Sequence, residues 1–380
     1  MSLIVGIDAS NIRRGGGVTH LVELLLAAHR GKIQFSSIVI WAGQSTLAAI
    51  EDHTSIRKCN PPALDQGLIQ RTSWQLFSLS QAVRDAGCNV LFVPGGSYCG
   101  DFHPVVTMNQ NLLPFELLEL KRYGLTLTTL RFFLLRIIQS CSYRRSDGVI
   151  FLTNYAHNQV TRVTGPLRGK ISIIPHGLNL RFIQEPKPQR EIQYYSVENP
   201  LRLLYVSTID QYKHQWHVVK AVSILRREGF PIELDLVGPA YPPALKRLNA
   251  TITLLDPKRD WVHYCSAIPY SEIHEKYAIS DIAIWASTCE TFGIILLEAM
   301  AAGLPIACSN KQPMPEVVGR ASVFFDPEQP NDIACALRQL INSPRLRAEF
   351  AYRSYQKAQE FSWERCADET FKYLASIAQI

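Results

Sequence analysis

Two carboxylates eight residues apart mark the segment whose side chains could do chemistry. Glu290 stands just before a run of apolar residues that is typical of a helix, and Glu298 lies inside that run. Burying a carboxylate among apolar side chains is costly unless hydrogen-bond donors reach it. Two vicinal ribose hydroxyls would supply two donors, so the spacing favours a nucleotide contact at Glu298. The alternative is a Glu298 that forms a salt bridge on a partly exposed helix surface.

The start of the same helix could bind an anion. Backbone N–H groups around Phe292, Gly293 and Ile294 should lack an intrahelical acceptor, because a helix leaves its first amides unpaired. These amides and the helix dipole favour a negative group such as a diphosphate. Glu290 would then lie close to a sugar hydroxyl or to the anomeric carbon of a sugar on that diphosphate.

A lysine after another predicted strand could supply positive charge to the same anion. The segment 207–214 reads Ser-Thr-Ile-Asp-Gln-Tyr-Lys-His and follows the apolar run Leu201–Val206. Lys213 is therefore a candidate phosphate contact. The alternative is an ordinary surface lysine after a strand.

Glycines near the N-terminus could also approach a phosphate or a sugar. Gly16 and Gly17 follow the first predicted strand and precede a predicted helix, and glycine permits close backbone approach. A tight turn is the alternative explanation. The dinucleotide pattern G-x-G-x-x-G is not met because His20 occupies the last position, and no acidic residue follows about twenty positions on. An NAD-dependent oxidoreductase is therefore disfavoured.

The elements that must position these residues follow one another as strand and helix. Apolar, non-alternating strands between helical segments are typical of a parallel, doubly wound α/β sheet. A polar stretch with three prolines, residues 184–200, predicts a linker between two Rossmann-like domains at 1–183 and 201–360. The predicted strands are Leu3–Ile7, Ser37–Trp41, Val90–Val93, Val105–Met108, Val149–Leu152, Ile171–Ile174, Leu201–Val206, Ile232–Val237, Ile282–Ala286 and Pro305–Ser309. The predicted helices include Val18–His29, Ser73–Ala86, Gln215–Glu228, Gly293–Ala302, Ile333–Asn342, Pro344–Gln359 and Ser362–Ile377.

The motif around the two carboxylates resembles a known family. Glu290-x7-Glu298, with Phe292-Gly293 after the first Glu and Ala-Met-Ala-Ala-Gly-Leu-Pro after the second, is similar to the retaining glycosyltransferases of family 4. The likeness is specific over residues 171–370 and loose before them. It implies the GT-B fold, two Rossmann-like domains facing across a cleft, with a helix at about 361–380 that packs back on the first domain. Further matching segments are Ile173–Asn179 with Phe182, Leu236–Gly238, Met314–Val318 and Phe361–Trp363.

The resemblance also implies roles for the candidate residues. Glu290 and Lys213 would be catalytic, and Gln110 and Asn111 would lie on the acceptor side. The implied donor-binding residues are Gly16, Gly17, Ser207, Thr208, Lys213, Ile268, Thr291, Phe292, Gly293, Ile294, Ile295 and Glu298.

Two positions depart from the family pattern. Thr208 replaces an arginine, which removes one positive charge from the diphosphate site. Gln110 and Asn111 replace a His-Asp pair before Pro114, and neither amide is a general base near neutral pH. Because family members are thought to use front-face chemistry assisted by the donor phosphate, the missing histidine need not abolish transfer.

These features predict a hexosyltransferase that uses a nucleotide-sugar and a lipid-linked or polysaccharide acceptor. A UDP-sugar is the first expectation for the donor and GDP-mannose the second. We expect no cofactor and no metal, since a strict DxD motif is absent. The competing interpretations are a nucleotide-sugar epimerase and a catalytically silent sugar-nucleotide-binding protein of the same fold. Thr208 and Gln110 mildly favour a catalytically inactive protein, whereas Glu290 and Lys213 argue against one.

Charge is distributed unevenly along the chain. The net charge is +7 through Glu185 and −1 afterwards, so the first half should favour an anionic partner. We expect a cytoplasmic protein, with the inner face of a membrane as an anionic surface it could meet. The segment Lys121–Arg145 is either a core-packing helix with solvated arginines or a membrane-facing element. Nucleic acid is not expected because no basic run is interleaved with aromatics, and nothing in the sequence indicates the oligomeric state.

Overall fold

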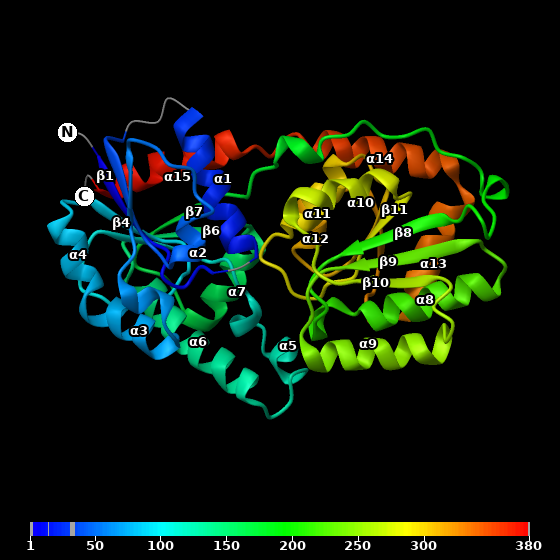
Figure 1. The fold of residues 1–380 in the computed structure, drawn as a ribbon, viewed down its shortest axis with the longest axis horizontal. Helices are drawn as coiled ribbons and strands as arrows, with labels where there is room; N and C mark the ends of the chain where they lie inside the picture. The colour runs from blue at the N-terminus through cyan, green and yellow to red at the C-terminus, as the bar shows by residue number, and fades with distance from the viewer. Residues whose placement is uncertain (1–2, 14, 31–34, 379–380) are drawn as a thin grey trace. The chain divides into compact units, whose positions relative to one another are not determined.

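The computed structural model describes residues 3–13, 15–30 and 35–378. It divides into two compact units, each built on its own parallel sheet (Figure 1). The first unit comprises the chain up to Gly177 together with the segment from Phe361 onward, and the second unit comprises Leu178–Glu360. Two Rossmann-like sheets of this kind were predicted, and that prediction of the fold class is confirmed.

The first sheet has seven parallel strands in the order β3-β2-β1-β4-β5-β6-β7. Its central strands are buried from end to end, as expected for strands covered on both faces. The strands are β1 (Ile4–Asp8), β2 (Ser37–Trp41), β3 (Ile56–Cys59), β4 (Val90–Val93), β5 (Val105–Met108), β6 (Gly148–Phe151) and β7 (Lys170–Ile173). The α-helices of this unit are α1 (Gly16–Arg30), α2 (Gln44–Leu47), α3 (Leu68–Phe77), α4 (Leu79–Asp85), α5 (Leu117–Lys121), α6 (Leu127–Arg145), α7 (Asn154–Thr164) and α15 (Trp363–Ala378).

The second sheet has six parallel strands in the order β10-β9-β8-β11-β12-β13. Its strands are β8 (Leu201–Val206), β9 (Ile232–Val237), β10 (Val262–Cys265), β11 (Ile282–Trp285), β12 (Ile306–Ser309) and β13 (Ser322–Phe325). Its α-helices are α8 (Gln215–Arg227), α9 (Pro242–Leu255), α10 (Ile273–Ile279), α11 (Ile294–Ala301), α12 (Met314–Val318), α13 (Pro330–Asn342) and α14 (Pro344–Ala358).

Both sheets reverse their strand order at one point. In the first sheet the reversal falls between β1 and β4, and in the second it falls between β8 and β11. Loops at the carboxyl ends of such a strand pair diverge to opposite faces of the sheet, and the crevice between them is where ligands bind in open α/β sheets. The topology therefore singles out the loops that follow Val206 and Trp285 in the second unit.

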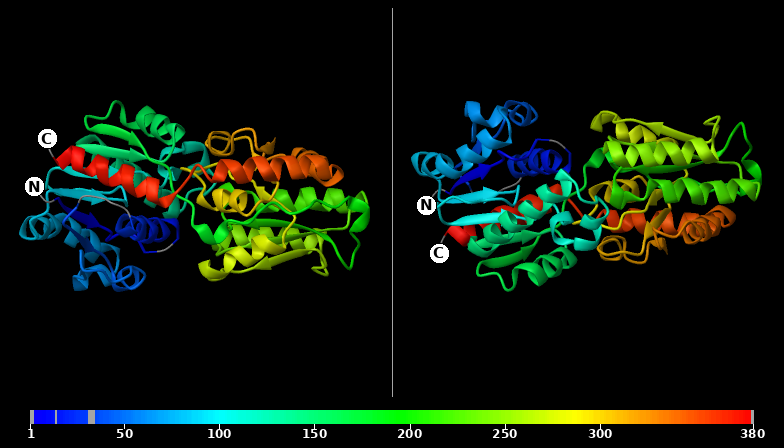
Figure 2. Two further views of the ribbon diagram at one scale, coloured as in Figure 1. Left: turned by 90° about the horizontal axis from the view of Figure 1, so that it is seen from above. Right: turned by 90° about the horizontal axis from the view of Figure 1, so that it is seen from below.

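The last helix, α15, belongs to the first unit although it ends the chain. It packs against α1 and β4, and both views of Figure 2 show it lying along that unit. Gly177 makes the close approach possible, because a Cβ there would lie 2.2 Å from the backbone nitrogen of Trp363. The ring of Phe371 on α15 also stacks on Phe35 at 5.0 Å.

Residues 184–200 are not a free linker, as the sequence predicted, but part of the second unit. The fully buried guanidinium of Arg347 explains this placement. It donates hydrogen bonds to the Gln189 side chain and to the carbonyl of Arg190, and so holds the proline-rich stretch on the unit. Residues 178–183, assigned to the first domain from the sequence, also lie in the second unit.

Two predicted helices differ from the observed ones. The run Ser73–Ala86 is interrupted at Ser78, which ends α3 and precedes α4. The segment Lys121–Arg145 becomes helical only from Leu127, because Gly124 has a φ of +64° and Thr126 caps the helix by accepting the Thr129 amide.

Three strands were missed. β3, β10 and β13 lie at sheet edges and are only partly buried. Their sequences therefore lack the continuous apolar run that identifies a central strand.

Candidate functional site

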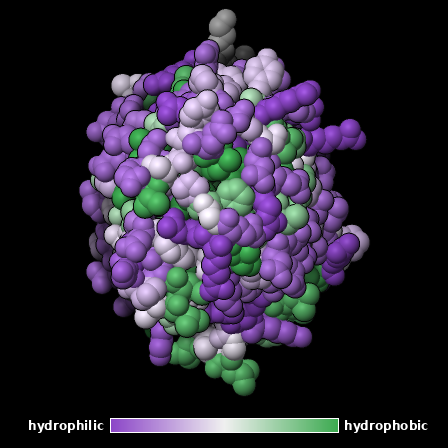
Figure 3. Space-filling view, turned by 90° about the vertical axis from the view of Figure 1, so that its right-hand side faces the viewer, coloured by the Kyte–Doolittle hydropathy of each residue, from purple (hydrophilic) through white to green (hydrophobic). Residues whose placement is uncertain are grey.

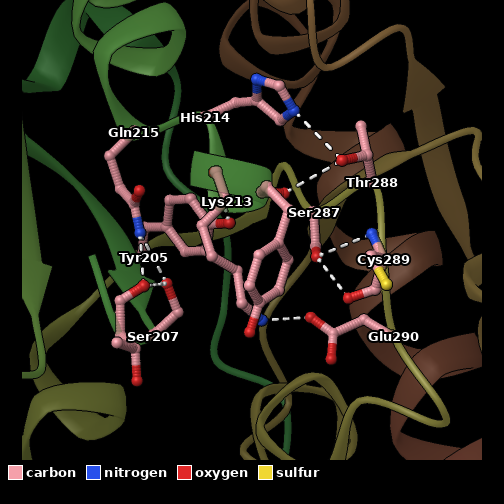
Figure 4. Close-up of polar contacts among 11 residues, drawn as sticks. Tyr205, Ser207, Lys213, His214, Gln215, Ser287, Thr288, Cys289 and Glu290 are labelled. Carbon is pink, nitrogen blue, oxygen red and sulfur yellow. Dashed lines mark hydrogen bonds and ion pairs between the residues drawn. The ribbon is translucent and has the colours of Figure 1, made fainter. Parts of the chain in front are cut away.

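Lys213 and Glu290 lie together where the strand order of the second sheet reverses (Figure 4). Lys213 ends a short 3-10 turn, Gln211–Lys213, that follows β8, and Glu290 follows β11. The ammonium of Lys213 pairs directly with the Glu290 carboxylate. Lys213 is only 6% exposed, so the alternative of an ordinary surface lysine is wrong.

Aromatic rings also hold the Lys213 ammonium. It lies 4.5 Å from the centre of the Trp285 ring and 5.0 Å from that of Tyr212. A cation near the face of an aromatic ring is attracted by the ring quadrupole, more strongly when water is excluded. The charge therefore has a fixed place beside the carboxyl edge of the sheet.

Hydrogen bonds join the two loops that carry this ion pair. The Tyr205 hydroxyl donates to the Lys213 carbonyl at 2.8 Å. The Thr288 amide donates to the Tyr212 carbonyl at 2.9 Å, and the Thr288 hydroxyl lies 3.2 Å from Nε2 of His214. Burial, and then the charge of Glu290, raises the pKa of Tyr205. The Tyr205 hydroxyl therefore stays protonated and remains a donor to the loop.

Glu298 is buried inside α11, and two tyrosine hydroxyls reach it. The hydroxyl of Tyr270 donates to Oε1 at 2.7 Å, and that of Tyr277 lies 3.5 Å from Oε2. Burial, and then the charge of Glu298, raises the pKa of Tyr277 well above its usual value. At 1% exposure, Glu298 cannot be the surface salt bridge considered above. The two tyrosine hydroxyls are donors of the kind that a buried carboxylate requires.

The start of α11 has the form expected of an anion site. Gly293 precedes the helix in the left-handed region, with a φ of +92°, and no side chain caps the helix there. Phe292 is buried, whereas Thr291, Ile294 and Ile295 are partly exposed. The first amides of α11 are therefore not taken up by a capping side chain.

The residues after β8 approach this place from the other loop. Gln215 donates to the Ser207 hydroxyl at 2.8 Å and to the Thr208 carbonyl at 2.9 Å. Gly238 fits beside them because a Cβ there would lie 2.2 Å from the Ser207 carbonyl oxygen. Thr208 is exposed, and Ile268 is partly exposed in the irregular stretch after β10.

The remaining candidates lie in the first unit. Gly16 and Gly17 begin α1, and a Cβ on Gly17 would lie 3.6 Å from the side-chain oxygen of Gln110. The side chain of Asn111 accepts the Leu113 amide at 3.1 Å. The structure thus places Gly17 beside the predicted acceptor-side residue Gln110.

Sequence reasoning missed the aromatic partners of the charged residues. Trp285 ends β11 and is the second-to-last residue of the predicted strand Ile282–Ala286, so its position beside Lys213 could have been inferred. Tyr270 and Tyr277 precede Glu298 by 28 and 21 residues, and no local pattern links them to it. Only the tertiary fold brings Tyr277 to the carboxylate, with its hydroxyl also donating to the Ile295 carbonyl of α11 at 3.2 Å.

Two general findings apply to the part of the chain that the structure describes. Within it, no three His, Cys, Asp or Glu side chains gather in a way that could hold a metal ion. No helix in the same residues is long and apolar enough to span a membrane.

The second unit matches a protein family. Residues 188–357 fit the family described as Glycosyl transferases group 1. The second unit is therefore similar in sequence to a group 1 glycosyl transferase domain. Lys213, Glu290 and Glu298 all lie inside the matched range, which agrees with the resemblance drawn from the motif.

One relative of the group 1 domain is the O-antigen chain mannosyltransferase B of Escherichia coli. It is 33% identical over 237 residues, which cover 62% of this chain and 58% of that protein. A D-inositol 3-phosphate glycosyltransferase of Paenarthrobacter aurescens is 25% identical over 208 residues. The chain spans about half to three fifths of the length of the relatives it matches.

Solved structures show the same fold for the whole chain. Sucrose-phosphate synthase of Thermosynechococcus elongatus aligns with a TM-score of 0.76 at 17% identity, over 98% of both chains. The HepE protein of Anabaena, solved with UDP-glucose, aligns with a TM-score of 0.72 at 16% identity, over 98% of this chain and 99% of that one. The predicted GT-B fold is confirmed.

Proposed function

We propose that this chain is a retaining glycosyltransferase that moves a hexose from a nucleotide-sugar donor to a lipid-linked or polysaccharide acceptor. The observation that carries the proposal is the ion pair of the buried Lys213 with the partly exposed Glu290, at the point where the second sheet reverses its strand order. That pair lies within the residues that match the group 1 glycosyl transferases.

Lys213 would stabilise the negative charge that develops on the departing nucleoside diphosphate. An ammonium has three donor hydrogens, so Lys213 can keep Glu290 and also bind a diphosphate oxygen. A charge already held between aromatic rings needs little rearrangement when the leaving group departs, which is the basis of electrostatic catalysis. Glu290 would face the transferred sugar and hold it at the reacting carbon.

Glu298 would bind the ribose of the donor. Tyr270 and Tyr277 hold its carboxylate, and two vicinal ribose hydroxyls would donate to the same carboxylate. The amides at the start of α11, where the helix dipole favours an anion, would then receive the diphosphate. Ser207, Thr208 and Ile268, with Gly16 and Gly17, would complete the donor site, and Gln110 and Asn111 would contact the acceptor.

Two donors have specific support. A UDP-sugar is supported by the HepE structure, which contains UDP-glucose. GDP-mannose is supported by the name of the Escherichia coli relative, a mannosyltransferase that acts on an O-antigen chain. The same name supports a polysaccharide or its lipid-linked precursor as the acceptor.

We also propose that transfer requires no metal, since Lys213 supplies positive charge at the diphosphate and the sequence lacks a DxD motif. A cytoplasmic location with reversible attachment to the inner face of a membrane is proposed as well. It is supported by the +7 charge of the chain through Glu185.

Donor turnover tests the proposal. The purified protein is incubated with UDP-glucose or GDP-mannose and a membrane-lipid extract, with and without EDTA, and release of the nucleoside diphosphate is followed by ³¹P NMR. We expect release that survives EDTA and a product that keeps the donor's anomeric configuration. Binding of the nucleotide without any release would instead favour the catalytically silent alternative, and interconversion of free nucleotide-sugars would favour an epimerase.

A further inference from the structure

Three helices of the first unit expose large apolar side chains to solvent. Of 21 strongly exposed large hydrophobic residues in the described part of the chain, 13 lie on or beside α3, α5 and α6. Figure 1 shows these helices along one side of the unit. We call this set of 13 residues the apolar face: Leu68, Ile69, Leu76, Phe77, Leu117, Leu118, Leu125, Leu127, Leu130, Phe133, Leu134, Ile137 and Ile138.

α6 has the reverse of the usual arrangement of a surface helix. The apolar residues at 127, 130, 134 and 137 recur at helical spacing and point outward, together with Phe133 and Ile138. Its fully buried residues are instead Gln139, Ser142 and Tyr143. The alternative of a core-packing helix is therefore wrong for most of this segment.

α3 repeats the pattern. Ile69 and Phe77 each expose 82% of their surface, whereas the buried residue of the helix is Gln75. By contrast, the face shown in Figure 3 is mostly hydrophilic, with hydrophobic side chains scattered over it in small groups. Large apolar side chains gathered on neighbouring helices of a folded unit mark a place where another apolar partner binds.

The charges around the apolar face are mainly positive. The sequence of residues 65–85 and 116–145 contains eight arginines and lysines but four carboxylates, Asp65, Asp85, Glu116 and Glu119. Glu119 is buried and accepts two hydrogen bonds from Arg122, at 2.7 and 3.2 Å. The segments that carry the apolar face therefore have an excess of cations over carboxylates.

Three arginines converge beside α3 and α6 at the border of this face. Arg71 lies close enough to Arg13 and Arg131 that their charges, after its own burial, lower the pKa of its guanidinium. Arg13 and Arg71 donate to the backbone carbonyls of Gln66, Gly67 and Ser10 at 3.4 Å. Asp65 lies close enough to Arg13 for their opposite charges to interact. Like charges held together repel one another, and a further anion beside Arg71 and Arg131 would relieve the remaining repulsion.

We propose that the apolar face and the Arg13–Arg71–Arg131 cluster bind the surface of an anionic lipid bilayer. The apolar side chains would enter the boundary between head groups and acyl chains, and the arginines would bind lipid phosphates. A second copy of the chain fits less well, because two such faces would bring their cations together. The proposal deepens the membrane attachment proposed above by assigning it to a defined surface, and it uses residues other than Lys213, Glu290 and Glu298.

Vesicle co-sedimentation tests this inference with the full chain. We expect pelleting with vesicles of phosphatidylglycerol and phosphatidylcholine at low salt, little pelleting with phosphatidylcholine alone, and release at high salt. The variant Phe133→Ser/Ile137→Ser should lower the partition coefficient at least tenfold. Arg71→Gln/Arg131→Gln should lower it by roughly fivefold for each cation removed and should reduce the salt dependence.

Matched controls come from the second unit. Leu254→Ser removes an apolar side chain that is 78% exposed on α9, and Arg227→Gln/Arg345→Gln removes two exposed cations there. These variants should pellet like the parent chain. A melting temperature and a nucleotide affinity equal to those of the parent show that each variant is folded.

Three results would overturn the lipid proposal. These are absence from the anionic pellet at low salt, equal loss of pelleting in the controls, and lipid-free self-association that Phe133→Ser/Ile137→Ser abolishes. The last result would make the face a contact between copies of the chain. None of them bears on donor turnover, so failure here and failure of the proposed reaction can be told apart.

Discussion

At the scale of single residues, a substitution of Glu290 should affect turnover and nucleotide affinity differently. Glu290→Gln keeps the shape but removes the charge opposite Lys213. Turnover should fall by about 100-fold or more, as when one preorganised electrostatic group is lost from a site. Nucleotide affinity should hold or improve, because Lys213 loses its competing carboxylate. Nucleotide release and calorimetric affinity measure the two effects, and near-normal turnover would mean that Glu290 only supports the loop.

Tyr270 offers a second test at this scale. Tyr270→Phe removes the 2.7 Å hydrogen bond to Glu298 and keeps the ring. Since such a bond contributes about 1 kcal/mol or more when its acceptor is charged, nucleotide affinity should fall by roughly fivefold to tenfold. Tyr264→Phe is the matched control, because its hydroxyl donates to the Gly238 carbonyl at 3.1 Å. Equal affinities of the two variants would argue against a positioning role for Tyr270.

At the scale of elements, the absence of a side chain at Gly177 allows the start of α15 to pack closely against the first unit. Gly177→Ala would place a Cβ within 2.5 Å of backbone atoms of Ser362 and Trp363, where no flexible side chain can yield. Overpacking of this kind costs about 1–3 kcal/mol, or roughly 3–10 °C in melting temperature. Gly95→Ala, whose Cβ would meet only Asn11 at 3.7 Å, should melt like the parent chain. If both variants melt alike, the contact at Gly177 does not limit the stability of the unit.

The same junction should make the first unit sensitive to acid. His20 on α1 and His176 are both buried with their Nδ1 atoms 3.0 Å apart, and Trp363 packs on both rings. Burial lowers the pKa of His20 to about 3 and that of His176 well below 6.5. Both are neutral when folded but take up protons when unfolded below about pH 6.5. The contribution of the two neutral histidines to the free energy of unfolding is therefore fully present above about pH 6.5. It is lost progressively as the pH falls towards 3.

The acid sensitivity is measured as unfolding free energy against pH. Each histidine contributes a slope of up to about 1.4 kcal/mol per pH unit below pH 6.5. His20→Leu should reduce the slope between pH 6.5 and 4.5, and His53→Gln, at an exposed site, should leave it unchanged. An unaltered slope in His20→Leu would exclude this pair as the origin of the acid effect.

At the scale of the whole molecule, regular features of the sequence predicted most of the fold. Central strands such as Ser37–Trp41 and Leu201–Val206 were predicted with their observed bounds, because strands buried on both faces are continuously apolar. The edge strands and the path of residues 184–200 were not predicted, because both depend on contacts with residues far away in the sequence. Arg347, which holds that path, lies about 150 residues away in the sequence.

The candidate site divides in the same way. Lys213 and Glu290 could be predicted to meet, because each follows a strand at the reversal of a parallel sheet. The contacts of Tyr270 and Tyr277 with Glu298 could not be predicted, because no local sequence pattern links these residues.

The outward direction of the apolar residues of α6 could not be predicted either. An amphipathic pattern identifies an apolar stripe on a helix but does not indicate what that stripe packs against.

One titration tests the central claim, that the second unit binds a nucleotide-sugar donor through Glu298 and Lys213. Calorimetry of the protein with UDP, GDP, dTDP, ADP and NAD is repeated with Glu298→Ala and Lys213→Ala. We predict saturable binding of UDP or GDP and none of NAD. Each variant, folded by its melting temperature, should bind about 5-fold to 150-fold more weakly, as expected for the loss of hydrogen bonds to charged groups. Binding of NAD alone, or unchanged UDP or GDP affinity in a folded Glu298→Ala protein, would contradict the account.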